Sequence, residues 1–138
     1  MSNQGKTAVV FTDGSVKNQG FSNATAGYGV FWGHGHANNR SNVVSGQQDS
    51  NRAELFAAYD AIKTAAHQGF SGINVCSDST YVRNSVMGNS QQTHNRDLVD
   101  AIQGLKSKVV VNVQQVTGHS GIPRNHEAHR LAAAAAKR

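Results

Sequence analysis

The 138-residue sequence contains one cysteine, Cys76, and one proline, Pro123, and it has no long hydrophobic run. A single cysteine cannot form a disulfide within the chain, which excludes the class of small disulfide-stabilised domains. No segment approaches the roughly 20 consecutive apolar residues of a membrane-spanning helix. The first residues, MSNQGKT, lack the apolar core of a signal peptide. We therefore expect a soluble, intracellular protein.

Acidic residues are scarce as well. Eight Asp and Glu against 13 Lys and Arg give a formal net charge of +5 and a sequence pI of about 9.7. Such a balance favours a polyanionic partner, either nucleic acid or an acidic membrane surface, and charge alone does not separate the two. The length is typical of one domain, so residues 1–138 are predicted to form a single domain around one core.

The hydrophobic pattern predicts alternating strands and helices. Three β-prone runs come first, punctuated by glycines of the kind that join antiparallel neighbours; helical spacing and further strands follow. The predicted strands are 7–12, 27–32, 41–46, 73–77 and 109–116, and the predicted helices are 51–68, short segments around 82–86 and 98–105, and 124–138. This order indicates an α/β fold with a five-stranded mixed sheet, in which three antiparallel strands are extended by two parallel ones and flanked by helices.

Three of the few carboxylates occupy informative positions. Asp13 follows an apolar run in FTDGS, Glu54 opens a helix in NRAEL, and Asp78 follows a buried strand in CSDS. Each also has an ordinary structural interpretation: Asp13 and Gly14 as a turn, Glu54 with Asn51 as a capping box, and Asp78 as a helix cap.

The three positions together favour a metal site. Parallel strands deliver their carboxyl ends to one edge of a sheet, and carboxylates converging there repel one another unless cations offset their charge. Divalent cations such as Mg²⁺ prefer oxygen ligands, and a pair of ions about 3.5 to 4 Å apart can stabilise both the attacking and the leaving oxygen of a phosphoryl displacement.

Four motifs in order, FTDGS at 11–15, NRAEL at 51–55, CSDS at 76–79 and GHSGIPRNHEAHRLA at 118–132, make the chain resemble the type 1 ribonuclease H domain. The resemblance implies the ribonuclease H-like fold and an endonuclease that cuts the RNA strand of an RNA/DNA hybrid, leaving 5′-phosphate and 3′-hydroxyl ends. It also implies two Mg²⁺ ions held by Asp13, Glu54, Asp78 and a fourth acid in the last helix. Asp13 would bridge the ions, and His119 would assist proton transfer or product release.

The resemblance further suggests residues that contact the hybrid. Gln19 and the pair Ser50 and Asn51 match positions that read the minor groove of the hybrid, and Asn95 matches a position that helps hold a DNA phosphate. A hybrid differs from duplex DNA in its 2′-hydroxyl groups and partly A-like shape, so polar side chains can discriminate without reading sequence. The alternative for these residues is ordinary loop and cap chemistry.

The chain departs from the family pattern at three points. His129 stands where the fourth acid is expected, and we predict that it is a weak substitute ligand that shifts the metal preference from Mg²⁺ toward Mn²⁺. The basic, tryptophan-containing element that grips the hybrid in many relatives is absent before Asn95, so affinity is expected to be weak and a fused or associated domain could supply it. Asp49 replaces a frequent threonine near a DNA phosphate, which it should repel.

Two other functions remain open at this point. A degenerate binding or scaffold domain would keep the fold and lose the acids, but Asp13, Glu54, Asp78 and His119 are all retained. A relative of integrases or transposases would place its third acid differently and would lack the loop motif GHSGIPRN. An active, monomeric hybrid endonuclease is therefore the leading hypothesis.

Overall fold

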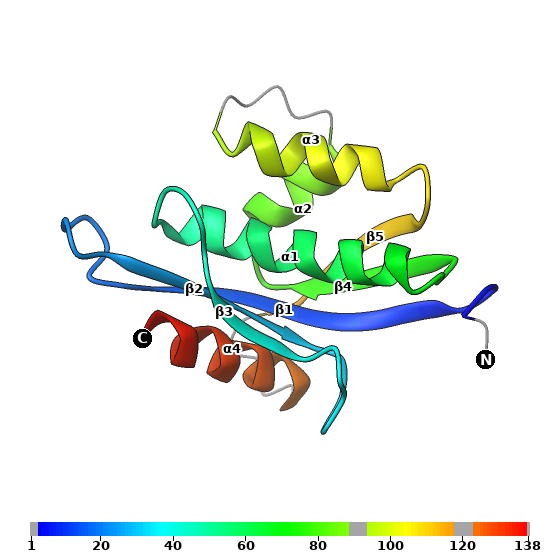
Figure 1. Cartoon of the computed structure of the whole chain (residues 1–138), viewed down its shortest axis with the longest axis horizontal. Helices are drawn as coiled ribbons and strands as arrows, with labels where there is room; N and C mark the ends of the chain where they lie inside the picture. Colours follow the sequence, from blue (N-terminus) through cyan, green and yellow to red (C-terminus); the bar gives the residue numbers. More distant parts are fainter. Residues whose placement is uncertain (1–2, 89–93, 118–122, 138) are drawn as a thin grey trace.

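The computed structural model describes residues 3–88, 94–117 and 123–137. Its strands form one sheet in the order β3-β2-β1-β4-β5, with β1 and β2 and then β2 and β3 antiparallel, and β4 and β5 added in parallel, as predicted. Figure 1 shows α1, α2 and α3 on one face of the sheet and α4 on the other. The elements are β1 Thr7–Lys17, β2 Thr25–Phe31, β3 Arg40–Val43, α1 Ser50–His67, β4 Gly72–Ser77, α2 Thr80–Met87, α3 Arg96–Leu105, β5 Val110–Gln115 and α4 Pro123–Ala136.

Strand β1 is longer than the sequence pattern indicates. We expected it to end near Asp13, but it continues to Lys17, so Asp13 and Gly14 belong to the strand and form no turn. The pairing explains the difference: β4 accompanies β1 only as far as Phe11, whereas β2 accompanies it to Lys17. Asp13 therefore lies inside β1 but beyond the last residue of β1 that pairs with β4.

Glycines inside the strands bring the helices unusually close to the sheet. A Cβ on Gly14 would lie 2.5 Å from the backbone nitrogen of Glu54 in α1, and one on Gly29 would lie 2.3 Å from the carbonyl oxygen of Ala128 in α4. We expected Gly14, Gly20, Gly27 and Gly29 to punctuate the strands. Gly20 does lie in the turn between β1 and β2, but the expectation is wrong for Gly14, Gly27 and Gly29, which lie inside strands. They are needed because both helices cross the sheet at backbone contact distance.

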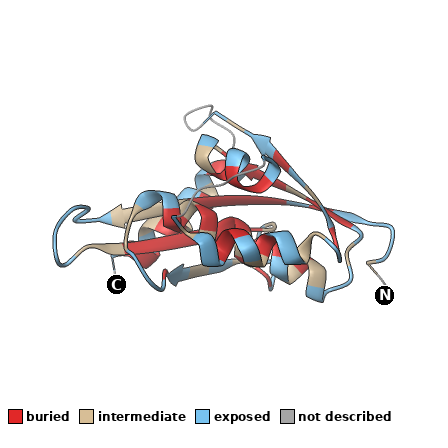
Figure 2. Cartoon of the chain, turned by 90° about the horizontal axis from the view of Figure 1, so that it is seen from above, coloured by how far each residue is buried: buried red, intermediate tan, exposed pale blue. Residues whose placement is uncertain are grey.

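Two hydrophobic clusters fill the two sides of the sheet. The larger lies between the sheet and α1 to α3 and includes Leu55 and Ile62. The smaller lies under α4 and consists of Phe11, Phe31, Cys76 and Ala128. Figure 2 shows the buried residues along the strands and on the inner sides of the helices. Within the described ranges, no helix is long and apolar enough to cross a membrane.

The helix caps correct two sequence interpretations. The side chain of Asp49 caps α1 by accepting a hydrogen bond from the backbone N–H of Arg52, and the hydroxyl of Ser79 caps α2. Glu54 therefore forms no capping box with Asn51. We expected Glu54 in the first turn of α1, but it lies beyond that turn. Asp78 is not the cap of α2. Because neighbouring residues cap both helices, Glu54 and Asp78 are available for chemistry.

Candidate active site

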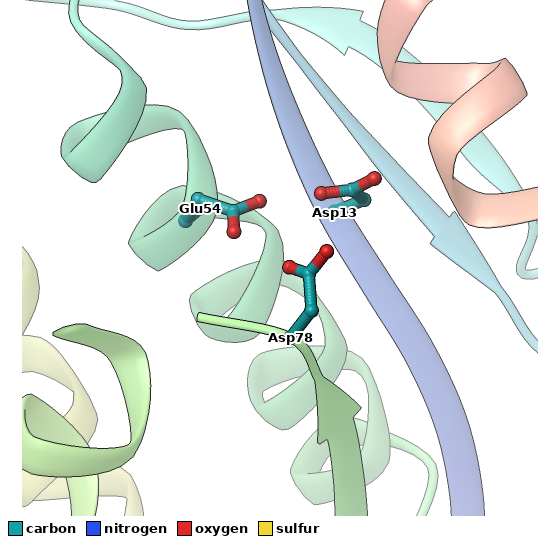
Figure 3. A group of neighbouring side chains, drawn as sticks. All are labelled: Asp13, Glu54 and Asp78. Carbon is teal, nitrogen blue, oxygen red and sulfur yellow. The ribbon is translucent and has the colours of Figure 1, made fainter. Parts of the chain in front are cut away.

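Three carboxylates from three separate elements meet beside the central strand. Asp13 comes from β1, Glu54 from α1 and Asp78 from the connection between β4 and α2, and their ligand oxygens lie within 4.8 Å of one another. Figure 3 shows the three side chains directed toward a common centre. Asp13 is the most buried of them, with 6% of its surface exposed.

The strand register and a close helix contact explain why they meet. Cys76 of β4 pairs with Phe11 of β1, so Asp78 and Asp13, each two residues further along, are brought level with one another. Gly14 lets the backbone of α1 approach β1 at the first residue after Asp13. The side chain of Glu54 therefore starts beside the strand that carries Asp13.

The proximity of three acids changes their protonation. Burial, hydrogen bonding to Asp13 and the charges of Asp13 and Asp78 raise the pKa of Glu54 to about 11. Burial and the charge of Asp13 also raise the pKa of Asp78, and His129 opposes that rise. Without a cation, the cluster therefore keeps a proton on Glu54 at neutral pH, which shows how strongly the arrangement favours added positive charge.

His129 reaches the edge of this cluster from α4. Its Nδ1 lies 2.9 Å from Oδ2 of Asp13, and its side chain is 60% exposed. The contact depends on Gly29, which pairs directly with Asp13 in the sheet and lets α4 approach at Ala128, the residue before His129. The histidine at the position of the expected fourth acid is thus joined to Asp13 through one ring nitrogen.

The expected substrate residues lie around one end of the molecule. Gln19 is exposed in the turn between β1 and β2, and Ser50 and Asn51 are exposed at the start of α1. Asn95 is the N-cap residue of α3. The turn and the starts of both helices lie on the same side in Figure 1. His119, the remaining site residue expected from the sequence, lies outside the described residues.

Sequence reasoning missed the role of Arg52. Only 7% of Arg52 is exposed, and its guanidinium forms a bidentate pair with Asp97, with distances of 3.0 and 2.8 Å. The sequence contained a signal for its burial. Leu55, Ala58 and Ile62 form a buried series at helical spacing, and the position three residues before Leu55 on the same helix face is Arg52.

The sequence is similar to those of known ribonucleases H. The RNase H family model matches residues 5–137 of the chain. Ribonuclease H1 of Rattus norvegicus is 33% identical over 146 aligned residues, which cover 96% of this chain and 51% of the relative. Ribonuclease H of Hahella chejuensis is 31% identical over 143 residues, covering 92% of this chain and 91% of the relative. The chain thus spans about half the length of the mammalian relatives that it matches.

Solved structures show the same architecture. RNase H1 from the halophilic archaeon Halobacterium salinarum superposes with a TM-score of 0.69 at 22% identity, covering 95% of this chain and 98% of that one. The solution structure of the PFV RNase H domain gives a TM-score of 0.73 at 20% identity, covering 94% of this chain and 93% of that one. At this level of identity the two structures support the fold.

Proposed function

The chain belongs to the RNase H family, with type 1 domains among its relatives, and from this premise we propose that it hydrolyses the RNA strand of RNA/DNA hybrids. The products would carry 5′-phosphate and 3′-hydroxyl ends. One observation carries the proposal: the oxygens of Asp13, Glu54 and Asp78 gather within 4.8 Å. Hydrolysis of a phosphodiester needs no protein nucleophile when such a cluster binds metal ions.

The cluster fits divalent cations. All three side chains offer oxygen, the donor that Mg²⁺ prefers. Oε1 of Glu54 is buried and finds no hydrogen-bond partner among the described residues. Burial, together with the charges of neighbouring carboxylates, raises the pKa values of Glu54 and Asp78. Two bound cations would stabilise the attacking and leaving oxygens of the displacement. Asp13 would suit the position between the two cations, because its carboxylate contacts the carboxyl of Glu54 and the imidazole of His129.

His129 would complete the ligand set in place of a carboxylate. A neutral imidazole contributes a nitrogen donor and no negative charge, and it suits Mn²⁺ better than Mg²⁺. We therefore propose that the chain is active with Mg²⁺, and that its activity favours Mn²⁺ more than the activity of a relative with a fourth acid would. For His119 we retain a role in proton transfer or product release.

Substrate contacts would come from the end of the molecule that carries the exposed starts of α1 and α3. Ser50, Asn51 and Gln19 are exposed and polar, as contacts with 2′-hydroxyl groups in a minor groove require. Asn95 would donate to a phosphate of the DNA strand. We propose that the chain acts as a monomer and that a fused or associated domain contributes hybrid affinity.

The test is cleavage of end-labelled substrates of one sequence: RNA/DNA hybrid, duplex RNA and duplex DNA, each with Mg²⁺ and with Mn²⁺. We expect cleavage of the RNA strand of the hybrid alone, and none by the Asp13→Asn variant prepared in parallel. Binding of the hybrid without cleavage under either metal would instead favour a degenerate binding domain. Cleavage that persists undiminished in Asp13→Asn would contradict the assignment of the cluster.

A further inference from the structure

Arg52, near the start of α1, connects the loop before α1 with the start of α3, where Asn95 lies 43 residues further along the chain. Its Nε donates to the carbonyl oxygen of Ser45, 2.7 Å away, in the loop before α1. Its Nη1 donates to Oδ1 of Asn95 at 3.2 Å, and both of its terminal nitrogens bind the carboxylate of Asp97 in α3. Gly46 packs directly against the guanidinium of Arg52, because a Cβ at Gly46 would lie 2.9 Å from Nε of Arg52. One guanidinium thus joins the β3–α1 loop, the start of α1 and the start of α3.

The contact with Arg52 determines which way the Asn95 amide faces. A guanidinium has only donors, so the amide oxygen of Asn95 must point toward Arg52 and its NH₂ group must point away. The NH₂ group donates one hydrogen bond to the hydroxyl of Tyr81, at 2.9 Å. An amide nitrogen carries two hydrogens, so one N–H of Asn95 has no acceptor among the described residues and can serve a further one. The hydrogen bonds with Arg52 and Tyr81 fix the direction of this N–H.

Arg52 also compensates a negative charge next to Asn95. The side chain of Asp97 is 64% exposed, two residues after Asn95, while that of Arg52 is only 9% exposed. Hydrogen bonding to Arg52 lowers the pKa of Asp97, so this carboxylate is charged at neutral pH. Without the guanidinium, Asp97 would repel a phosphate that approaches Asn95.

We propose that Arg52 is a positioning residue for hybrid recognition: it holds the Asn95 amide ready for a DNA phosphate and fixes the distance between Asn95 and the Ser50–Asn51 pair. The inference rests on the proposed function and deepens it. Contacts with phosphates set the register of a nucleic acid on a protein, and preorganised donors avoid the cost of ordering at binding. Arg52 itself, enclosed by protein, touches no substrate.

The test is a double-mutant cycle in hybrid cleavage, using Arg52→Lys, Asn95→Ala and the double variant. Lysine keeps the charge but loses the planar fork that reaches Asn95 and Asp97 together. We expect each single variant to raise KM about tenfold or more, as loss of one hydrogen bond to a charged group does, with kcat within about twofold. The double variant should be no worse than Asn95→Ala alone, because Arg52 acts through Asn95.

Arg40→Lys is the matched control. Arg40 also forms an ion pair with a carboxylate, Asp60 at 3.2 Å, and its replacement should leave KM unchanged; because its side chain is 46% exposed, the loss of thermal stability should be smaller than for Arg52→Lys. Asp97→Asn is a second route to the same question if Arg52→Lys does not fold, because it removes the main anchor of the guanidinium. Because Asp97→Asn also removes a charge that repels the phosphate, its test is the comparison of backgrounds: its effect on KM should differ with and without Asn95.

The possible outcomes separate this inference from the proposed function. A wild-type protein that cleaves no hybrid refutes the proposed function, and this inference with it. If the wild type cleaves but the effects on KM of Arg52→Lys or Asp97→Asn are the same with and without Asn95, Arg52 has a purely structural role. A fall in kcat with unchanged KM would also overturn the inference, since it would place the effect at the carboxylate cluster.

Discussion

Asp13 contacts Glu54 on one side and His129 on the other, so its carboxylate should be the least replaceable ligand. We expect Asp13→Asn to reduce cleavage at least about 100-fold, and Asp78→Asn to do the same, since each removes a charged metal ligand. Their melting temperatures without metal should not fall, because each amide relieves repulsion between like charges. Steady-state cleavage and thermal unfolding of purified variants measure both. Retention of more than a few per cent of activity would exclude the ligand role.

Glu54 should make the stability of the metal-free protein depend on pH. Its pKa is about 11 in the folded chain against an ordinary value of 4.5, so the folded state binds a proton that the unfolded state releases. The contribution of this group to stability is therefore greatest below the unfolded pKa and is lost as pH rises toward the folded one.

The variant Glu54→Gln removes that dependence. In the presence of a chelator we expect it to melt a few degrees above the wild type at about pH 8 and nearer to it at about pH 5. Added Mg²⁺ should raise the melting temperature of the wild type more than that of the variant. A variant less stable than the wild type at both pH values would mean that Glu54 makes a favourable contact that outweighs the repulsion.

His129 should affect metal preference more than folding, because its side chain is 60% exposed. We expect His129→Asp to lower the Mg²⁺ concentration needed for half-maximal cleavage, and His129→Ala to reduce activity with Mn²⁺ more than with Mg²⁺. Metal titrations of the three proteins test this. Identical metal affinities would mean that His129 contacts Asp13 without serving the metal.

At the level of elements, glycine in β2 controls the distance of α4 from the sheet. We expect Gly29→Ala to destabilise the protein by about 3 kcal/mol, a fall of about 10 °C in melting temperature, because its Cβ would meet the carbonyl oxygen of Ala128 at 2.3 Å. Gly104→Ala is the control: its Cβ meets nothing within 4 Å, and alanine in a helix should stabilise by up to about 1 kcal/mol. Similar melting temperatures for the two variants would contradict the close packing of α4.

The order of the elements was predictable because each strand and helix carries its own hydrophobic period. The extent of β1 was not, since Asp13 followed by Gly14 has the local composition of a turn. What keeps this dipeptide in the strand is pairing with β2, and what requires the glycine is the backbone of α1. Both causes lie outside the local sequence, which is why local reasoning misassigned the glycines.

For the molecule as a whole, the positive charge is less available than the net charge of +5 suggests. In the described part of the chain, four arginines are paired with carboxylates: Arg40, Arg52, Arg96 and Arg130. We therefore expect weak hybrid binding, with Kd of about 1 μM or above near physiological salt, and a salt dependence that corresponds to few phosphate contacts. Fluorescence anisotropy with the Asp13→Asn variant over a salt series measures both. Nanomolar binding by the isolated chain would contradict this.

The three acids of the candidate site were predictable because each lies in a short motif with a fixed order along the chain. Arg52 and Asp97 were not recognised as a pair, since 45 residues separate them and each resembles an ordinary helix residue. Their contact exists only after α1 and α3 have packed. Sequence reasoning therefore found the three acids that meet in the structure and missed the residues that hold the surrounding elements in place.

Strand β1 lies at the centre of the sheet, with β2 on one side and β4 on the other. Its backbone amides can exchange with solvent only when neighbouring strands separate, an opening that approaches global unfolding. Asp13 lies in this strand, so its carboxylate is held by the part of the fold that opens last. We expect the slowest hydrogen exchange in β1. The carboxylate of Asp13 should therefore keep its position on heating until the sheet itself opens.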